Sequence, residues 1–192
     1  MPAEIKNTVN GENDKSLFLY VTEHLDKDGR YDGSPLPDKP SRKYAYGAED
    51  AASFHPHTDN KFAEIARDIC VLLKKWMQKP TQQNKLRLYE QLAATPQVMV
   101  VLSLAARLDK MGLDYNLLNL AQEWFYTAKD REVVKFSYLI LGMIGLDQVR
   151  NTFSESLYDD LFTMARCEEF TIFLCLACQV CEMRPQKELW TL

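Results

Sequence analysis

The C-terminal cysteines have the spacing that most suggests a chemical site. Cys175, Cys178 and Cys181 form a C-x2-C-x2-C run, and Cys167 stands eight residues before it. Thiolates at such spacing bind zinc or an iron–sulfur cluster when they lie on loops. This run lies in an apolar stretch that predicts a helix, where six residues rise about 9 Å and keep three sulfurs from meeting at one ion. We therefore expect the cysteines to pack as small apolar residues, and Cys175 and Cys178 stay as weak metal candidates.

Two histidines form the second candidate. His55 and His57 flank Pro56, and Asp59 follows. Imidazole and carboxylate groups this close can bind a metal ion or hold a general base. The alternative is structural, because the segment leads into a helix that Thr58 or Asp59 can cap.

An enzyme would need more groups, and the sequence offers few. It has neither a glycine-rich phosphate loop nor a Gly-x-Ser-x-Gly turn. If the chain is an enzyme or a metal protein, we expect its site where the N-terminal segment crosses the helices. That site would use His55 and His57 with Asp50 or Asp59, and a cysteine as the further group. We predict no catalytic residue and no cofactor, and favour a non-enzymatic protein.

Basic residues gather at positions 74–87, where five Lys and Arg side chains include Lys74 and Lys75. Such a patch can hold nucleic-acid phosphates. Trp76 falls on the apolar stripe of its helix, so we expect it in the core rather than against a base. Nucleic-acid binding is therefore the weakest function considered.

Aromatic and acidic residues supply further surface candidates. Trp124, Phe125 and Tyr126 are adjacent, and at about 100° per residue they cannot all face the core. An exposed aromatic of this kind suits a partner site. The partner-binding candidates are Trp124, Tyr126, Lys74, Lys75, Asp159 and Asp160.

Helical periodicity positions these residues. From about residue 60, apolar side chains recur at spacings of three and four. Cap signals at Thr81, Thr95-Pro96, Asp114 and Asp130 divide the pattern into segments. Beyond the helix that ends at Pro80, we predict helices at 82–94, 97–111, 114–128, 131–145, 152–165 and 168–183.

The chain divides near residue 58. Residues 1–57 hold four of the seven glycines and many turn residues, which predicts a loop-rich N-terminal arm. Their apolar segment at 16–25 suits a helix capped by Ser16 or a strand. Residues 58–192 are predicted to form an all-α domain of helical hairpins.

The helices alternate in character. Amphipathic helices at 82, 114 and 152 precede helices that are apolar nearly all round, with a period of roughly 32–38 residues. Residues 130–135 (DREVVK) and 141–145 (LGMIG) resemble the second helix of a HEAT repeat, with its Asp turn, Val-Arg/Lys step and Leu-Gly-x-Ile-Gly ending. The resemblance implies stacked antiparallel hairpins in a HEAT-like α-solenoid. An irregular helix bundle is the alternative.

A second, fainter likeness lies at residues 43–55. It is similar to a Gly-Ala-x-Asp-Gly…His segment that precedes the helices of some uncharacterised bacterial proteins, with Ala51 in place of the second Gly. This likeness implies no activity.

Charge and composition narrow the function classes. The net charge is −4, residues 61–110 carry +5, and residues 151–183 carry −5. The overall balance disfavours a duplex nucleic-acid binder. No basic leader or 18-residue apolar run is present, and the five cysteines are expected to be reduced, so we predict a cytoplasmic protein that uses no membrane.

We therefore predict a protein–protein interaction module of an adaptor or immunity type, whose partner is another protein. One form of this hypothesis has the acidic end masking a basic partner. The sequence does not determine the partner's identity or the oligomeric state.

Overall fold

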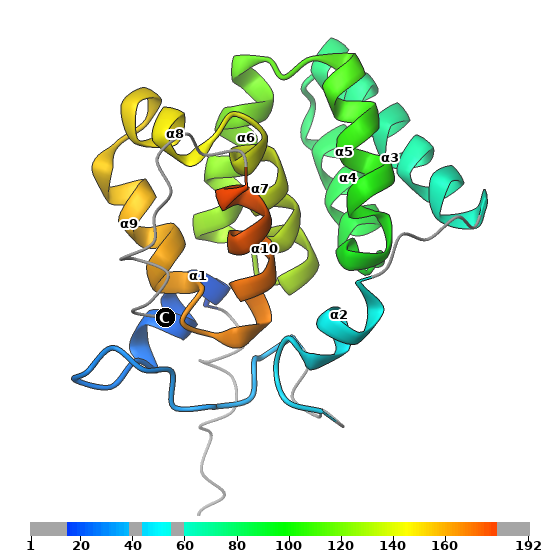
Figure 1. The fold of residues 1–192 in the computed structure, drawn as a ribbon. Coiled ribbons are helices and arrows are strands. Elements are labelled where there is room, and N and C mark those ends of the chain that lie inside the picture. The colour runs from blue at the N-terminus through cyan, green and yellow to red at the C-terminus, as the bar shows by residue number, and fades with distance from the viewer. Residues whose placement is uncertain (1–14, 39–43, 55–59, 180–192) are drawn as a thin grey trace, which may run out of the picture.

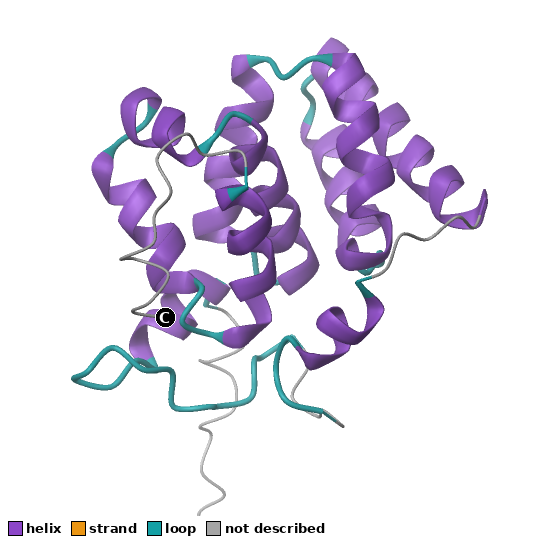
Figure 2. Cartoon of the chain, in the orientation of Figure 1, coloured by secondary structure: helices purple, strands orange, loops and turns teal. Residues whose placement is uncertain are grey.

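The computed structural model describes residues 15–38, 44–54 and 60–179. Within these ranges the fold is all-α, with ten helices and no strand (Figures 1 and 2). None of these helices is both long and apolar enough to cross a lipid bilayer. The helices are α1 (Leu17–Glu23), α2 (Ala48–Ser53), α3 (Asn60–Gln78), α4 (Gln82–Ala93), α5 (Gln97–Met111), α6 (Tyr115–Thr127), α7 (Arg131–Met143), α8 (Leu146–Thr152), α9 (Glu155–Met164) and α10 (Glu168–Cys178).

Three of the predicted helix starts are confirmed by their caps. Asp114 accepts the Leu117 amide at 2.8 Å, and Asp130 accepts the Glu132 amide at 3.0 Å. Thr81 caps α4 in the same way. Each side chain satisfies an amide that the first helical turn leaves without a partner, so these polar residues fix where the helices begin.

The predicted start of α5 at residue 97 is confirmed, but the predicted cap is wrong. Pro96 occupies the cap position and the helix begins at Gln97. The Thr95 hydroxyl does not cap α5; it donates to the Gln91 carbonyl at 2.7 Å. The first-turn amide of Gln97 is satisfied instead by Glu132 of α7, at 2.6 Å.

Two short helices, α2 and α8, were not predicted as helices, because six or seven residues show too little periodicity. The segment at 16–25, left open by the sequence, forms α1 with Ser16 as its cap. This helix packs against α6 and α9, and α2 packs against α10 and α5.

Helix α7 is the centre of the packing. It contacts α4, α5, α6 and α10, and Figure 1 shows α10 lying beside it. Most of its residues are buried, as the apolar pattern predicted. A Cβ atom at Gly142 would lie 2.6 Å from the Cβ of Ala177, so glycine is what allows α7 and α10 to approach here.

Candidate functional site

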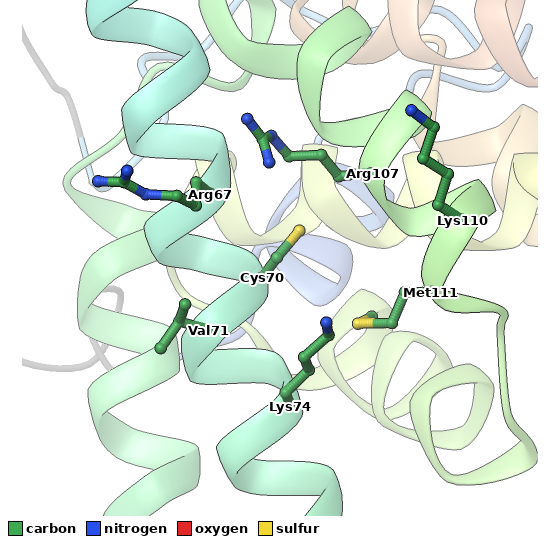
Figure 3. A pocket seen from close by; sticks show the side chains of 7 residues that line it. All are labelled: Arg67, Cys70, Val71, Lys74, Arg107, Lys110 and Met111. Atoms are coloured by element: carbon green, nitrogen blue, oxygen red, sulfur yellow. The ribbon is translucent and has the colours of Figure 1, made fainter.

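A pocket between α3 and α5 is lined by cations (Figure 3). Its volume is about 230 Å³, and no carboxylate is among its lining residues. We call it the basic pocket. Its lining residues are Arg67, Cys70, Val71 and Lys74 of α3 and Arg107, Lys110 and Met111 of α5.

Helical spacing places these side chains together. Positions 67, 70, 71 and 74 repeat at three and four residues, so they share one side of α3. Ala66, Ile69 and Leu73 take the buried side of α3. Because α3 and α5 pack against each other, a basic stripe from each helix borders the same groove.

The cations of the basic pocket are poorly neutralised. Arg67 lies 3.5 Å from Asp68, and both side chains are more than half exposed. Within the described part of the chain, Lys74, Arg107 and Lys110 are in no ion pair. Unpaired positive charge in a concave site attracts anions.

Cys70 forms part of the pocket wall and is nearly buried. Burial raises the pKa of its thiol, although the charges of Arg107 and Lys74 act in the opposite direction. The neutral thiol form therefore dominates at pH 7. The thiolate is the nucleophilic form, so this cysteine lacks the activation expected of a catalytic thiol.

A second group of charges lies buried where the N-terminal arm meets the helices. We call it the ion cluster. It consists of Asp38, Asp50, Arg131, Glu132, Lys135 and Glu169.

Lys135 occupies the middle of the ion cluster and is fully buried. Its Nζ lies 2.6 Å from Asp50 Oδ2, 2.7 Å from Glu169 Oε1 and 3.0 Å from Glu132 Oε1. Burial alone would lower the pKa of Lys135, but the three carboxylates reverse this and raise it. Lys135 therefore keeps its charge in the interior.

Arg131 links the arm to the helices. Its guanidinium donates two hydrogen bonds to the Asp38 carboxylate at 2.8 Å each, and its Nη1 lies 3.2 Å from Glu169 Oε1. A two-bond Arg–carboxylate pair fixes orientation as well as distance. Asp38 and Asp50 thus tie two parts of the arm to α7.

Carboxylates outnumber cations in the ion cluster. Burial raises the pKa of Asp50 and of Glu132, with Lys135 opposing it in each case. For Glu169 burial also acts upward, but the nearby Lys135 and Arg131 outweigh it and its pKa is lowered.

A cavity of about 240 Å³ opens beside the ion cluster, lined partly by its carboxylates. The functional groups of the cluster are engaged with one another, which suits a structural clamp better than a catalytic centre. Among the described residues, no three His, Cys, Asp or Glu side chains are arranged to hold a metal ion.

The predicted metal-binding residues lie partly outside and partly within the described part of the chain. His55, His57 and Asp59 lie outside the described residues. Cys175 is exposed, so the expectation that it packs in the core is wrong, and Cys178 is partly buried. Both side chains project from one regular helix, α10.

The predicted aromatic candidates are largely occupied. Trp124 is 3% exposed and packs against Tyr89 and Phe136, so its prediction as a partner residue is wrong. Tyr89 and Phe136 cover the indole ring, which the sequence alone allowed to be exposed. Tyr126 donates a hydrogen bond to Asp160 at 2.7 Å, so these two candidates engage each other.

The charged candidates are the accessible ones. Asp159, Lys74 and Lys75 are exposed. Of these, Lys74 lines the basic pocket.

Sequence reasoning missed the rest of the basic pocket. Arg107 and Lys110 lie near the end of a helix chosen for its apolar character, and Arg67 was not grouped with Lys74. Their spacing of three and seven residues was a usable signal. That α3 and α5 face each other was not readable from the sequence.

Comparison of the chain with known protein families, with curated proteins and with solved structures finds no match to any of them.

Proposed function

We propose that the chain is a non-enzymatic protein–protein interaction module that binds an acidic partner through the α3–α5 face. The observation that carries this proposal is the basic pocket, where four cationic side chains border one groove with no carboxylate among its lining residues. An acidic segment would be steered toward it and held by charge-assisted hydrogen bonds.

Apolar groups accompany the charges. Val71, in the pocket wall on α3, is 57% exposed, and Met111 of α5 also lines the pocket. Arginine beside exposed apolar side chains is typical of interface residues that contribute most to affinity. The face therefore offers both charge and apolar area to a protein.

We further propose that the helices form a HEAT-like stack. The helices apolar nearly all round, α5, α7 and α10, form a row through the α5–α7 and α7–α10 contacts. A polar ladder joins their N-termini: Glu132 accepts the Gln97 amide, and Lys135 donates to Glu169. These hydrogen bonds join residues near the N-termini of successive helices that lie about one predicted repeat apart in the sequence. Such regular contacts between repeats support a stacked arrangement.

The proposal places the protein in the cytoplasm. Among the described residues, Cys70, Cys167 and Cys175 are free thiols. Free thiols are typical of a reducing compartment.

A photo-crosslinking experiment tests the proposed interface. The full chain carries a photoreactive phenylalanine at Val71, and a control carries it at Leu19, which is 51% exposed on α1. We expect one partner to be crosslinked from Val71 and not from Leu19. The partner is then purified and its affinity measured for the wild type and for Arg107→Glu.

The expected result is a loss of affinity of about a hundredfold in Arg107→Glu and steep weakening with salt. Equal crosslinking from Leu19, no adduct at Val71, or unchanged affinity of Arg107→Glu would each overturn the proposal. Circular dichroism of each variant checks that it is folded.

A further inference from the structure

We infer that the basic pocket is a phosphate site, and that the partner docks by a phosphorylated side chain. The inference rests on the proposed function and names the group that the partner presents. Its evidence is the direction of the pocket side chains, their charge, and the volume between them.

Two of the four cations point inward. Figure 3 shows Arg107 and Lys74 reaching from facing helices toward the space beside Cys70, whereas Arg67 is directed away from it. Both inner charges act on the thiol of Cys70, consistent with this placement. The pocket therefore has two inner cations, with Arg67 and Lys110 at its rim.

The inner charges match a phosphate better than a carboxylate. A phosphorylated side chain carries about −1.5 to −2 charges and three acceptor oxygens. A carboxylate carries a single charge and would leave one inner cation without a counter-charge. Arg107 can offer two parallel N–H donors to phosphate oxygens, and Lys74 adds a point charge.

The remaining wall does not oppose an anion. Cys70 is held as a neutral thiol by burial, so it adds no negative charge and is a weak donor. Val71 and Met111 supply apolar surface for the carbon atoms of the side chain that carries the phosphate. The volume of about 230 Å³ exceeds a single water's share of about 30 Å³ several times, which leaves room for a tetrahedral anion.

The residues that line the pocket also favour a phosphorylated protein over a nucleic acid as the ligand. No aromatic residue borders the pocket, so unstacked bases have no surface on which to stack. Trp76, the nearest aromatic in the sequence, is buried. A single phosphate group fits these residues better than a strand does.

The test uses two fluorescent peptides of the same glycine-rich sequence, one with phosphoserine and one with aspartate at its centre. Binding to the full chain is measured by anisotropy at low and at physiological salt. Variants Arg107→Gln and Lys74→Gln remove the inner charges. Lys75→Gln is the matched control, because Lys75 is the next residue of α3 and lies outside the pocket.

We expect the phosphoserine peptide to bind at least tenfold more tightly than the aspartate peptide. Each inner variant should weaken it at least fivefold, and Lys75→Gln less than twofold. Inorganic phosphate should compete with the peptide in the wild type and lose that ability in Arg107→Gln.

Three results would overturn the inference. The first is equal affinity for the two peptides. The second is an equal loss in Lys75→Gln, which would mean general electrostatics. The third is tighter binding of inorganic phosphate alone or of a generic oligonucleotide, which would assign the pocket to a free anion or to nucleic acid. If the peptides fail but the partner crosslinked from Val71 still loses affinity for Arg107→Glu, the proposed function stands with a carboxylate partner.

Discussion

Replacing Lys135 with methionine tests the role of the ion cluster. Lys135→Met keeps the length of the side chain and removes its charge. Asp50, Glu132 and Glu169 then lose the cation that lies within 3.0 Å of each of them. Removing one partner of a buried ion pair costs about 3–5 kcal/mol, because the remaining charge is left without compensation. We expect a loss of that size in the free energy of unfolding at pH 7.

The loss should shrink in acid, and its slope can be worked out. Without Lys135 the three carboxylates have higher pKa values in the folded than in the unfolded chain, so the folded state binds protons more tightly. Each extra proton held by the folded state recovers about 1.4 kcal/mol per pH unit. Lowering the pH from 7 to about 5 should therefore restore roughly 2–3 kcal/mol for one proton.

Urea unfolding followed by tryptophan fluorescence provides the assay, since Trp76 and Trp124 are buried reporters. Lys85→Met is the matched control. Lys85 pairs with Glu123 at 2.6 Å, but that pair lies at the surface, and its loss should cost below about 1 kcal/mol with little pH dependence. A Lys135→Met variant as stable as Lys85→Met at pH 7, with the same pH profile, would refute the reasoning. Adding Glu169→Gln to Lys135→Met should restore part of the loss.

Three further predictions concern packing, capping and acid stability. Gly142→Ala should destabilise the fold by about 1–3 kcal/mol in urea unfolding, because the new methyl group meets Ala177; a change below the error of the measurement would contradict the close α7–α10 approach. Asp114→Ala should cost about 1 kcal/mol in the same assay, because the Leu117 amide loses its cap, whereas Asp114→Asn should retain most of the stability. In the wild type, the pKa values of Asp50 and Glu132 are raised, so acidification from pH 7 to about 5 should not lower the free energy of unfolding. Stability should fall only below the ordinary Glu pKa, because the pKa of Glu169 is lowered and its stabilisation is lost there. A fall that begins above pH 5 in urea unfolding would contradict these shifts.

The sequence determined the longer helices to within a few residues, whereas the short helices α2 and α8 were not predicted. The caps at Asp114 and Asp130 and the break at Pro80 act locally, so their effect follows from adjacent residues alone. The apolar character of α7 likewise predicted its burial, since a helix that is apolar nearly all round must be covered on most sides.

The sequence did not determine which surfaces stay open. Trp124 was predicted as a partner-binding residue but is buried, because Tyr89 and Phe136, from other parts of the chain, pack against it. Cys175 was predicted to be buried but is exposed, because the sequence of one helix does not show which helices will pack against it.

Both charge groups were decided by the tertiary structure. The ion cluster unites Asp50 of the arm with Lys135 and Glu169, and the basic pocket unites Lys74 with Arg107. Local rules fix the face of a helix on which each charge lies, and they act over one turn. The way all the helices bury their apolar sides together decides which helix faces meet. Only this packing brings the charges together into the ion cluster and the basic pocket.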